Sequence, residues 1–427
     1  MKVFLGIDLG STTSKAVFID QEGTIIGRGI TNTRSNYEVA ADIARMEAEF
    51  NSRFFLLRRE LGTESNSWDK VLPPLKNRFN YLQFLARFNL LIETMEGNLK
   101  TVASATHRKD IKTLLKRLAV EIQEECQERF FNGKVTTTSE FFRDLFSSIY
   151  MQKIQDEDKA LFDQLVALYD RSITPVENQV IDFDFKELME AALELLPDTF
   201  ASAYEPLHKH LQSVAQFSLE PTDYIGTGYG RQLLPFEQKH IKSEILCHAM
   251  GAHANFPQTR TVLDIGGQDT KAIQVDQNGM VTSFQMNDRC AAGCGRYLGY
   301  IADEMNVSVS ELGPIALNAD YETNICSTCT VFAGAELREY LNLGEKKENI
   351  LAGLHQAIVQ RAFALLARSG GVRNEFTFTG GVARNPAVIK YVSQMVTQSY
   401  GQVTINIHPD SIFMGALGAA LFSAQRQ

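Results

Sequence analysis

Apolar and polar residues follow the same pattern in two separate stretches of this chain. Residues 3–8 form an apolar run that ends in an aspartate, residues 13–20 combine β-branched with other apolar residues, and residues 24–31 form a third such run after a glycine turn. Short β-branched and apolar runs separated by tight turns predict a meander of three strands. Residues 261–285 repeat the pattern without a gap, so we expect a second meander there.

Identities at one fixed spacing indicate an internal duplication. Unrelated stretches of this length would give roughly one or two matches. Two meanders, each with a glycine turn directed at one place, predict two lobes that face a cleft. Six residues of the first stretch recur 256 positions later: Asp8, Gly10, Lys15, Ala16, Asp20 and Gly23 as Asp264, Gly266, Lys271, Ala272, Asp276 and Gly279.

The segment between the copies has a different composition. Residues 36–220 are rich in Leu, Phe, Glu, Lys and Arg and poor in Gly. We interpret this segment as a mainly helical insertion whose apolar stripes form a core, with a partner-binding or substrate-binding face as the alternative. Helical apolar spacing is found at 81–95, 111–131, 139–155 and 185–196.

The last third of the chain alternates predicted helices and strands. Helices are expected at 350–367, 386–398 and 414–424, and strands at 375–379 and 403–407. The expected organisation is an α/β fold of two lobes with one large insertion. Its parts are residues 1–35 and 221–260 for lobe I, 36–220 for the insertion, 261–400 for lobe II, and 401–427 for a C-terminal strand and helix that close the fold.

Composition narrows the class of protein. Among the 427 residues no run of about 18 apolar residues occurs, so no membrane-spanning helix is expected. The net charge of −9 argues against nucleic-acid binding. Met1 leads directly into a strand, which leaves no room for a signal peptide, and we expect a cytoplasmic protein. In that setting the six cysteines are free thiols or metal ligands rather than disulfides.

The first glycine turn carries residues suited to a metal-bound nucleotide. Asp8 ends a buried strand and is the expected Mg²⁺-binding and catalytic carboxylate, directly or through water. The glycine lets the backbone approach phosphate, and hydroxyl, N–H and ammonium donors follow. The nucleotide-binding residues expected here are Gly10, Ser11, Thr12, Thr13 and Lys15.

The second glycine turn offers the same set from the other lobe. Asp264 and Gln268 are expected to be catalytic, by orienting an attacking water, and Gly266 and Gly267 to approach phosphate. The chain has no G-x-x-x-x-G-K-[ST] segment, so this is not a Walker A loop. The alternative is that each glycine only turns a hairpin. The two matching copies favour a nucleotide site.

A third glycine turn follows the predicted strand 375–379 and opens a helix. Gly380 and Gly381 allow close approach of a flat adenine or a ribose, and we assign Arg384 and Asn385 to the same site. Taken together, Ile7-Asp8-Leu9-Gly10-Ser11-Thr12-Thr13, Asp264-Ile265-Gly266-Gly267 and Thr379-Gly380-Gly381-Val382 resemble the two phosphate motifs and the adenosine motif of the acetate kinase, sugar kinase, Hsp70 and actin superfamily. The resemblance implies an actin-like ATPase that binds ATP.

Four cysteines stand in two pairs before predicted helices. Cys290 and Cys294 precede a helix at 297–304, and Cys326 and Cys329 precede one near 333–341. Helix N-termini lower thiol pKa values and favour metal–thiolate centres. Three interpretations remain from the residues alone: four buried reduced thiols, a zinc or iron–sulfur site within one chain, or a cluster to which two chains each give two thiolates.

The cysteine segments resemble those of one family in particular. Asp288-Arg289-Cys290-Ala291-Ala292-Gly293 and Ser327-Thr328-Cys329-Thr330-Val331-Phe332-Ala333 are similar to the cluster motifs of the BadF/BadG/BcrA/BcrD-type ATPases, which activate 2-hydroxyacyl-CoA dehydratases and power benzoyl-CoA reductases. The resemblance implies a 4Fe–4S cluster shared between two subunits, with Cys290 and Cys329 as this chain's ligands. Cys294 and Cys326 depart from the family pattern and leave the ligand set open.

The insertion and the run Thr31-Asn32-Thr33-Arg34-Ser35-Asn36-Tyr37 resemble the larger ATPase subunit of benzoyl-CoA reductases. That resemblance implies ATP-driven, low-potential electron transfer to a CoA-ester reductase, with ferredoxin or flavodoxin as donor and a smaller paralogue as the second subunit. A homodimer and activation of a 2-hydroxyacyl-CoA dehydratase are the alternatives. Two other classes are a small-molecule kinase of the same fold and a zinc-stabilised regulatory ATPase.

Overall fold

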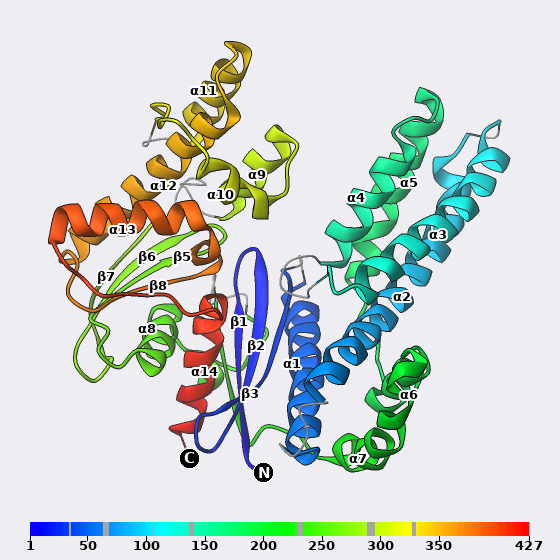
Figure 1. The fold of residues 1–427 in the computed structure, drawn as a ribbon, viewed down its shortest axis with the longest axis horizontal. Helices are drawn as coiled ribbons and strands as arrows, with labels where there is room; N and C mark the ends of the chain where they lie inside the picture. Colours follow the sequence, from blue (N-terminus) through cyan, green and yellow to red (C-terminus); the bar gives the residue numbers. More distant parts are fainter. Residues whose placement is uncertain are drawn as a thin grey trace. The chain divides into compact units, whose positions relative to one another are not determined.

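The computed structural model divides the chain into two compact units (Figure 1). One unit comprises Met1–Thr33 and Glu220–Gln427, and the other comprises Arg34–Leu219. The structure describes residues 1–33, 36–62, 68–104, 106–135, 141–228, 234–287, 295–326 and 330–426.

The first unit contains two sheets of like topology. Each begins with an antiparallel meander, and each adds a parallel strand beside the first strand of that meander. The first sheet has the order β3-β2-β1-β4, with β1 Val3–Leu9, β2 Thr13–Asp20, β3 Ile25–Asn32 and β4 Asp223–Gly228. The second has the order β7-β6-β5-β8-β9, with β5 Thr261–Ile265, β6 Thr270–Val275, β7 Val281–Asn287, β8 Phe376–Thr379 and β9 Ile405–Asn406.

Strand register confirms the predicted duplication. Asp8 lies opposite Lys15 in the first sheet, and Asp264 lies opposite Lys271 in the second, again 256 positions apart. The tight turns match as well, because the Asp20 and Asp276 carboxylates each accept two backbone N–H groups at 2.8–2.9 Å. Even the sheet irregularity recurs at this spacing, between Phe18 and Ile19 and between Gln274 and Val275.

The repeat extends to the fourth strand of each sheet. Gly228 ends β4 with φ 136°, and Gly380 follows β8 with φ 91°. A Cβ at Gly228 would lie 2.2 Å from the Leu9 carbonyl oxygen, and one at Gly380 would lie 2.2 Å from that of Ile265. Both positions therefore require glycine, for the backbone angle and for the close approach.

Two helices of the first unit cross with their backbones in contact. They are α8 (Glu244–Asn255) and α14 (Met414–Ala424). A Cβ at Gly251 of α8 would lie 2.1 Å from the Met414 carbonyl oxygen, and one at Gly418 of α14 would lie 1.8 Å from that of Cys247. Figure 1 shows α14, in red, alongside the blue strands of the first sheet, whereas Ile245, Ala249 and Ala252 of α8 pack on β5 and β6.

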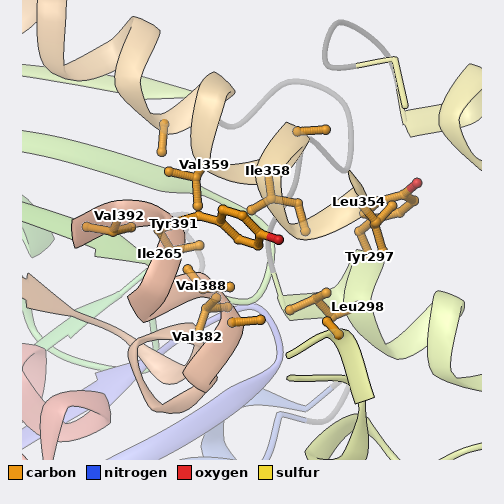
Figure 2. Close-up of a cluster of buried hydrophobic side chains, with 14 of the residues drawn as sticks. Ile265, Tyr297, Leu298, Leu354, Ile358, Val359, Val382, Val388, Tyr391 and Val392 are labelled. Atoms are coloured by element: carbon orange, nitrogen blue, oxygen red, sulfur yellow. The ribbon is translucent and has the colours of Figure 1, made fainter. Parts of the chain in front are cut away.

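The second sheet is covered by α12 (Lys347–Ser369) and α13 (Pro386–Tyr400). Of all described helices, α12 alone is long and apolar enough to cross a membrane by length and composition, although the sequence suggested none, and 72% of its most apolar window is buried inside the structure. Figure 2 shows the core in which these helices meet α9 (Gly295–Met305). Its labelled side chains are Ile265, Tyr297, Leu298, Leu354, Ile358, Val359, Val382, Val388, Tyr391 and Val392.

All regular secondary structure in the described residues of the second unit is helical. The helices expected at 81–95, 111–131 and 185–196 correspond to parts of α2, α3 and α6, and the first residues of the one expected at 139–155 lie outside the described residues. The buried Arg53 donates to the Val214 and Ala215 carbonyls and ties the first helix to the last. The helices are α1 Tyr37–Glu60, α2 Trp68–Val102, α3 Arg108–Phe131, α4 Phe142–Ile154, α5 Lys159–Glu177, α6 Phe185–Glu194 and α7 Tyr204–Gln216.

The contact between β1 and α14 predicts that Gly6 cannot be enlarged. A Cβ at this residue would lie 2.0 Å from the Ala416 carbonyl oxygen, so Gly6→Ala must displace the helix and should lower the free energy of unfolding by about 3 kcal/mol. Gly299→Ala in α9 is the matched control, because a Cβ there meets nothing within 4 Å. It should stabilise by roughly 0.5–1 kcal/mol. Urea unfolding measures both, and equal stability of the two variants would contradict this packing.

Candidate functional site

The first half of the site is a cross-strand ion pair beneath a glycine turn. Lys15 Nζ lies 3.3 Å from Asp8 Oδ2, and both side chains are buried. A Cβ at Gly10 would lie 3.0 Å from the same ammonium group, so the turn sits close above the pair. Within the described residues this lysine is the one polar partner of the Asp8 carboxylate. The carboxylate therefore keeps acceptor capacity for a cation.

The second half repeats the pair but surrounds it with further groups. Lys271 Nζ lies 3.4 Å from Asp264 Oδ2 and 2.7 Å from Asp269 Oδ1. Thr379 Oγ1, at the end of β8, donates to Asp264 Oδ1 at 2.8 Å. Burial opposes ionisation of Asp264, but the neighbouring cations and these hydrogen bonds outweigh it and hold the pKa of this carboxyl below its ordinary value.

Helix α8 adds two residues that sequence reasoning missed. His248 Nδ1 lies 3.2 Å from Asp264 Oδ1, and Glu244 Oε2 lies 3.9 Å from Lys271 Nζ. Burial lowers the pKa of His248, but the Asp264 carboxylate outweighs it, so the pKa is raised overall. Burial also raises the pKa of Glu244. A lone His on a buried helix gives no sequence signal of such a role. The one indication in the sequence is Glu244, which stands four residues before His248 and therefore lies on the same face of the helix.

The two glycine turns lie against each other. A Cβ at Gly267 would lie 2.0 Å from Thr12 Oγ1 and 3.6 Å from Ser11 Oγ. Thr12 is exposed, while Ser11, Thr13 and Gln268 are partly exposed. The structure thus brings the residues expected to bind phosphate into one small region at the ends of β1 and β5. It also leaves their polar groups within reach of a ligand.

The third glycine turn is built differently from expectation at one residue. Gly381 and Arg384 are exposed, but the Asn385 amide has internal partners. Its Oδ1 accepts from the first N–H groups of α13 at 3.0 and 3.2 Å, and its Nδ2 lies 3.0 Å from Nε2 of the buried His355. Burial lowers the pKa of His355 to about 4, so the imidazole is neutral and accepts this hydrogen bond. Asn385 therefore positions the turn.

The second glycine turn, which is expected to bind phosphate and is called the phosphate turn from here on, also holds the start of α9. Gly295 N–H donates to the Gly266 carbonyl at 2.8 Å, and Arg296 N–H donates to the Gly267 carbonyl at 2.8 Å. These are first-turn N–H groups that have no partner within their own helix. The phosphate turn thus serves as the N-terminal cap of the helix that follows the first cysteine pair.

The cysteine pairs fall largely outside the described residues: Cys290, Cys294 and Cys329 have no described position. Cys326 is a partly buried free thiol whose backbone N–H donates to Glu336 Oε2 at 2.6 Å. Elsewhere in the described chain, Cys126 and Cys247 are buried and form no disulfide. The part of the chain that is described contains no group of three or more His, Cys, Asp or Glu side chains able to hold a metal.

The helices that follow the two cysteine segments are joined to each other. They are α9 and α11 (Thr330–Asn342). Arg338 Nη1 of α11 donates to the Tyr300 hydroxyl of α9 at 2.7 Å and lies 3.2 Å from Glu304 Oε1. A Cβ at Gly334 would lie 3.6 Å from the Tyr300 ring. The two helices that follow the cysteine segments are therefore linked through Tyr300 and Glu304 of α9.

Several characterised proteins are similar in sequence to this chain. It is 44% identical over 198 residues to the 2-hydroxyisocaproyl-CoA dehydratase activator of Clostridioides difficile, a match that covers 46% of this chain and 71% of the relative. It is 42% identical over 202 residues to the (R)-2-hydroxyglutaryl-CoA dehydratase activating ATPase of Acidaminococcus fermentans (47% and 75%). It is 32% identical over 229 residues to one of the subunits of benzoyl-CoA reductase from Thauera aromatica (54% and 80%).

Solved structures of two such activators share the fold. The activator of the 2-hydroxyisocaproyl-CoA dehydratase from Clostridium difficile, with bound ADPNP, matches 99% of this chain and 95% of its own at a TM-score of 0.52 and 22% identity. Component A of the Acidaminococcus fermentans (R)-2-hydroxyglutaryl-CoA dehydratase matches 100% and 99% at a TM-score of 0.52 and 24% identity. The likeness, together with the repeated sheets, confirms the expected actin-like ATPase fold.

A sequence profile decides the membership. The profile of the BadF/BadG/BcrA/BcrD ATPase family matches residues 5–423, which is nearly the whole chain. The match includes both phosphate turns, both cysteine segments and the helical unit between the two copies of the meander. This chain therefore belongs to the BadF/BadG/BcrA/BcrD ATPase family.

Proposed function

We propose that this protein is an ATP-hydrolysing activator that delivers a low-potential electron to a CoA-ester dehydratase of the 2-hydroxyacyl-CoA type. Relatives at 44% and 42% identity are described as an activator and an activating ATPase of 2-hydroxyacyl-CoA dehydratases, whereas the benzoyl-CoA reductase relative is 32% identical. The insertion favoured the reductase type, and the relatives favour the dehydratase type instead.

The contact between the phosphate turn and α9 is the observation that carries this proposal. The carbonyls of Gly266 and Gly267 accept hydrogen bonds from the first turn of α9, and α9 begins at the residue after Cys294. A nucleotide that moves the phosphate turn must also move this helix N-terminus. ATP binding and hydrolysis thereby gain a direct mechanical connection to the cysteine segment, which a kinase or a static zinc site has no need of.

In the nucleotide site Asp8 would hold Mg²⁺. It fits that task because its carboxylate is buried, is held by Lys15 from one side, and has no other polar partner among the described residues. Bound Mg²⁺ supplies charge stabilisation of the transferring phosphoryl group. Lys15, Ser11, Thr12 and the turn N–H groups would bind phosphate oxygens. Asp264 and Gln268 would orient the attacking water.

The redox group would be a 4Fe–4S cluster with Cys290 and Cys329 as ligands from this chain and two thiolates from a second subunit. The fit rests on thiol chemistry and on the joined helices α9 and α11, whose N-termini follow the two cysteine segments. The bound cluster supplies one-electron redox chemistry. For such a transfer, ~59 mV corresponds to a tenfold change in equilibrium, so ~1.4 kcal/mol of nucleotide-dependent strain shifts the driving force by that amount.

The partners follow from the same reasoning. The second subunit would be another copy of this chain or a smaller paralogue, the acceptor a CoA-ester dehydratase component, and the donor a ferredoxin or flavodoxin in the cytoplasm. The resemblance of the helical insertion to the larger ATPase subunit of benzoyl-CoA reductases favours a second candidate, the benzoyl-CoA reductase type. Chain length does not separate the two candidates: the dehydratase activator at 44% identity and the reductase subunit at 32% identity each have about 280–290 residues, since 198 residues make up 71% of the first and 229 residues make up 80% of the second.

Anaerobic purification tests the cluster directly. We expect a brown protein with about four irons per two chains, bleached by dithionite, that activates a 2-hydroxyacyl-CoA dehydratase in the presence of ATP. Cys290→Ser and Cys329→Ser should each remove the iron, whereas Cys294→Ser and Cys326→Ser should retain it. One zinc per chain would support the regulatory class, and sugar-dependent ATP consumption by a colourless protein would support the kinase class. Either result would refute this proposal.

Asp8→Asn should abolish hydrolysis without affecting the cluster. The substitution removes the negative charge that holds Mg²⁺, a contribution of several kcal/mol, so kcat should fall about 100-fold or more. Asp20→Asn, at the other end of the same hairpin, is the matched control, because Asp20 only accepts N–H groups of its turn. ATPase rate and iron content measure the outcome. A variant Asp8→Asn with wild-type kcat would exclude this residue from the metal site.

Gly295→Pro should uncouple hydrolysis from electron delivery. Proline is tolerated at the first helical position, but it removes the N–H that donates to Gly266 and puts its ring Cδ in the place of that hydrogen, so the start of α9 must move away from the turn. ATPase activity should persist while ATP-dependent activation of the dehydratase falls at least about tenfold. Gly295→Ala retains the N–H, and its Cβ would meet only atoms at 3.4 Å or more, so it should retain coupling. Equal activation by the two variants would show that this hydrogen bond carries no signal.

A further inference from the structure

The two halves of the nucleotide site are alike in their strands but differ in the helix that faces each of them. Asp8, Lys15 and Thr227 stand in register in the first sheet, as Asp264, Lys271 and Thr379 do in the second. The strand residues are equivalent in position, but Thr379 donates to Asp264 whereas Thr227 donates to the Lys242 carbonyl, and Asp269 stands where the first half has Thr13. The covering helices add a further difference.

The crossing of α8 and α14 defines which helix residues are equivalent. Gly251 contacts the Met414 carbonyl, and Gly418 contacts that of Cys247. If α8 and α14 are exchanged, one contact becomes the other, with Gly251 equivalent to Gly418 and Cys247 equivalent to Met414. The two residues of each equivalent pair are 167 positions apart in the sequence. The same spacing pairs His248 of α8 with Gly415 of α14. The duplicated site therefore has an imidazole over one carboxylate and a glycine over the other.

The imidazole lies between the two aspartates. Its Nδ1 is 3.2 Å from Asp264 Oδ1, at ion-pair distance though without the alignment of a hydrogen bond, and has no other polar partner among the described residues. Its Nε2 faces the other half. A Cβ at Gly415 would lie 2.8 Å from this Nε2 and 2.9 Å from Asp8 Oδ2, so these two atoms are at most 5.7 Å apart. The glycine makes room for both groups.

We propose that His248 is a positioning residue that fixes the Asp264 carboxylate for hydrolysis, and that its replacement by glycine in the other half leaves Asp8 free to bind the metal. The inference rests on the proposed ATPase function and divides its two carboxylates by task. Asp264 is held by Thr379, His248 and Lys271, from both of its oxygens. Asp8 is held by Lys15 alone among the described residues. A carboxylate held on both oxygens suits a fixed acceptor, and one held on a single side suits a metal ligand.

Three substitutions of His248 distinguish which of its two ring nitrogens hydrolysis requires. The amide nitrogen of Asn reaches the position of Nδ1, and that of Gln reaches the position of Nε2. His248→Ala should lower kcat for MgATP by about 10- to 100-fold while the affinity for MgADP stays within about threefold, because a misplaced carboxylate affects the chemical step. His248→Asn should recover most of the lost kcat, and His248→Gln should resemble His248→Ala.

A double variant tests whether His248 acts through Asp264. His248→Ala combined with Asp264→Asn should lose no more kcat than Asp264→Asn alone, since the effects of a residue and its positioning partner are not additive. His253→Ala, further along α8 and bonded only to the Gln277 carbonyl in the described structure, controls for loss of an imidazole from this helix. Its kcat should equal that of the wild type.

The outcomes distinguish failure of this inference from failure of the proposed function. Three results would overturn the role of His248 and leave the ATPase function intact. They are an unchanged kcat in His248→Ala, recovery of kcat by His248→Gln rather than by His248→Asn, and a loss in the double variant that equals the sum of the two single losses in free energy. A loss confined to MgADP affinity would overturn it as well. A wild-type protein that hydrolyses no ATP would overturn both.

Discussion

Backbone contact between α8 and α14 is the constraint on which the rest of the nucleotide site depends. Gly251 and Gly418 remove the side chains that would separate the helices. The close crossing lets each helix reach the sheet of the opposite half, so α8 covers β5 and β6 and α14 lies on β1 against Gly6. The identity of the groups that face each aspartate is therefore set by helix packing, and each larger side chain at the crossing would change the site as well as the core.

Charge balance explains why the second half tolerates so many buried ionisable groups. An unpaired carboxylate in such a place costs several kcal/mol. Lys271 is within 3.9 Å of Asp264, Asp269 and Glu244, and these three carboxylates outweigh burial and raise its pKa. Burial raises the pKa of Glu244. The second half thus holds a network of ion pairs around Lys271, whereas the first half holds the single ion pair of Asp8 with Lys15.

The parts of the fold that could be predicted from the sequence are mainly those in which identical residues recur at one fixed spacing. The two meanders and their aspartates recur at 256 positions. The fourth-strand glycines Gly228 and Gly380 are only 152 positions apart, because a longer connection follows the first meander, and a search at one offset misses them. Helix α1 was missed because small alanines make up much of its buried face, and α5 because it contains Pro175.

Only those residues of the candidate site that lie within a recognisable sequence motif could be predicted. Motif positions predicted two phosphate-binding turns, which the structure brings together, but His248 comes from a helix between them in the sequence and is brought to Asp264 by packing. Asn385 followed a glycine pair and was expected to bind the nucleotide, yet its amide caps α13 and contacts His355. Hydrogen-bond partners of this kind depend on tertiary neighbours that no local spacing records.

The contact between the second glycine turn and the start of α9 is made by backbone groups alone, so no pattern of side chains predicts it. A peptide group is planar and trans, so the carbonyl of Gly266 and the N–H of Gly267 belong to one rigid unit and point in opposite directions. The carbonyl holds the N-terminus of α9. In the proposed function the N–H on the other side of the same plane faces phosphate. A rotation of this plane that follows loss of a phosphate must then shift both partners together, and glycine at both positions permits that rotation at low cost.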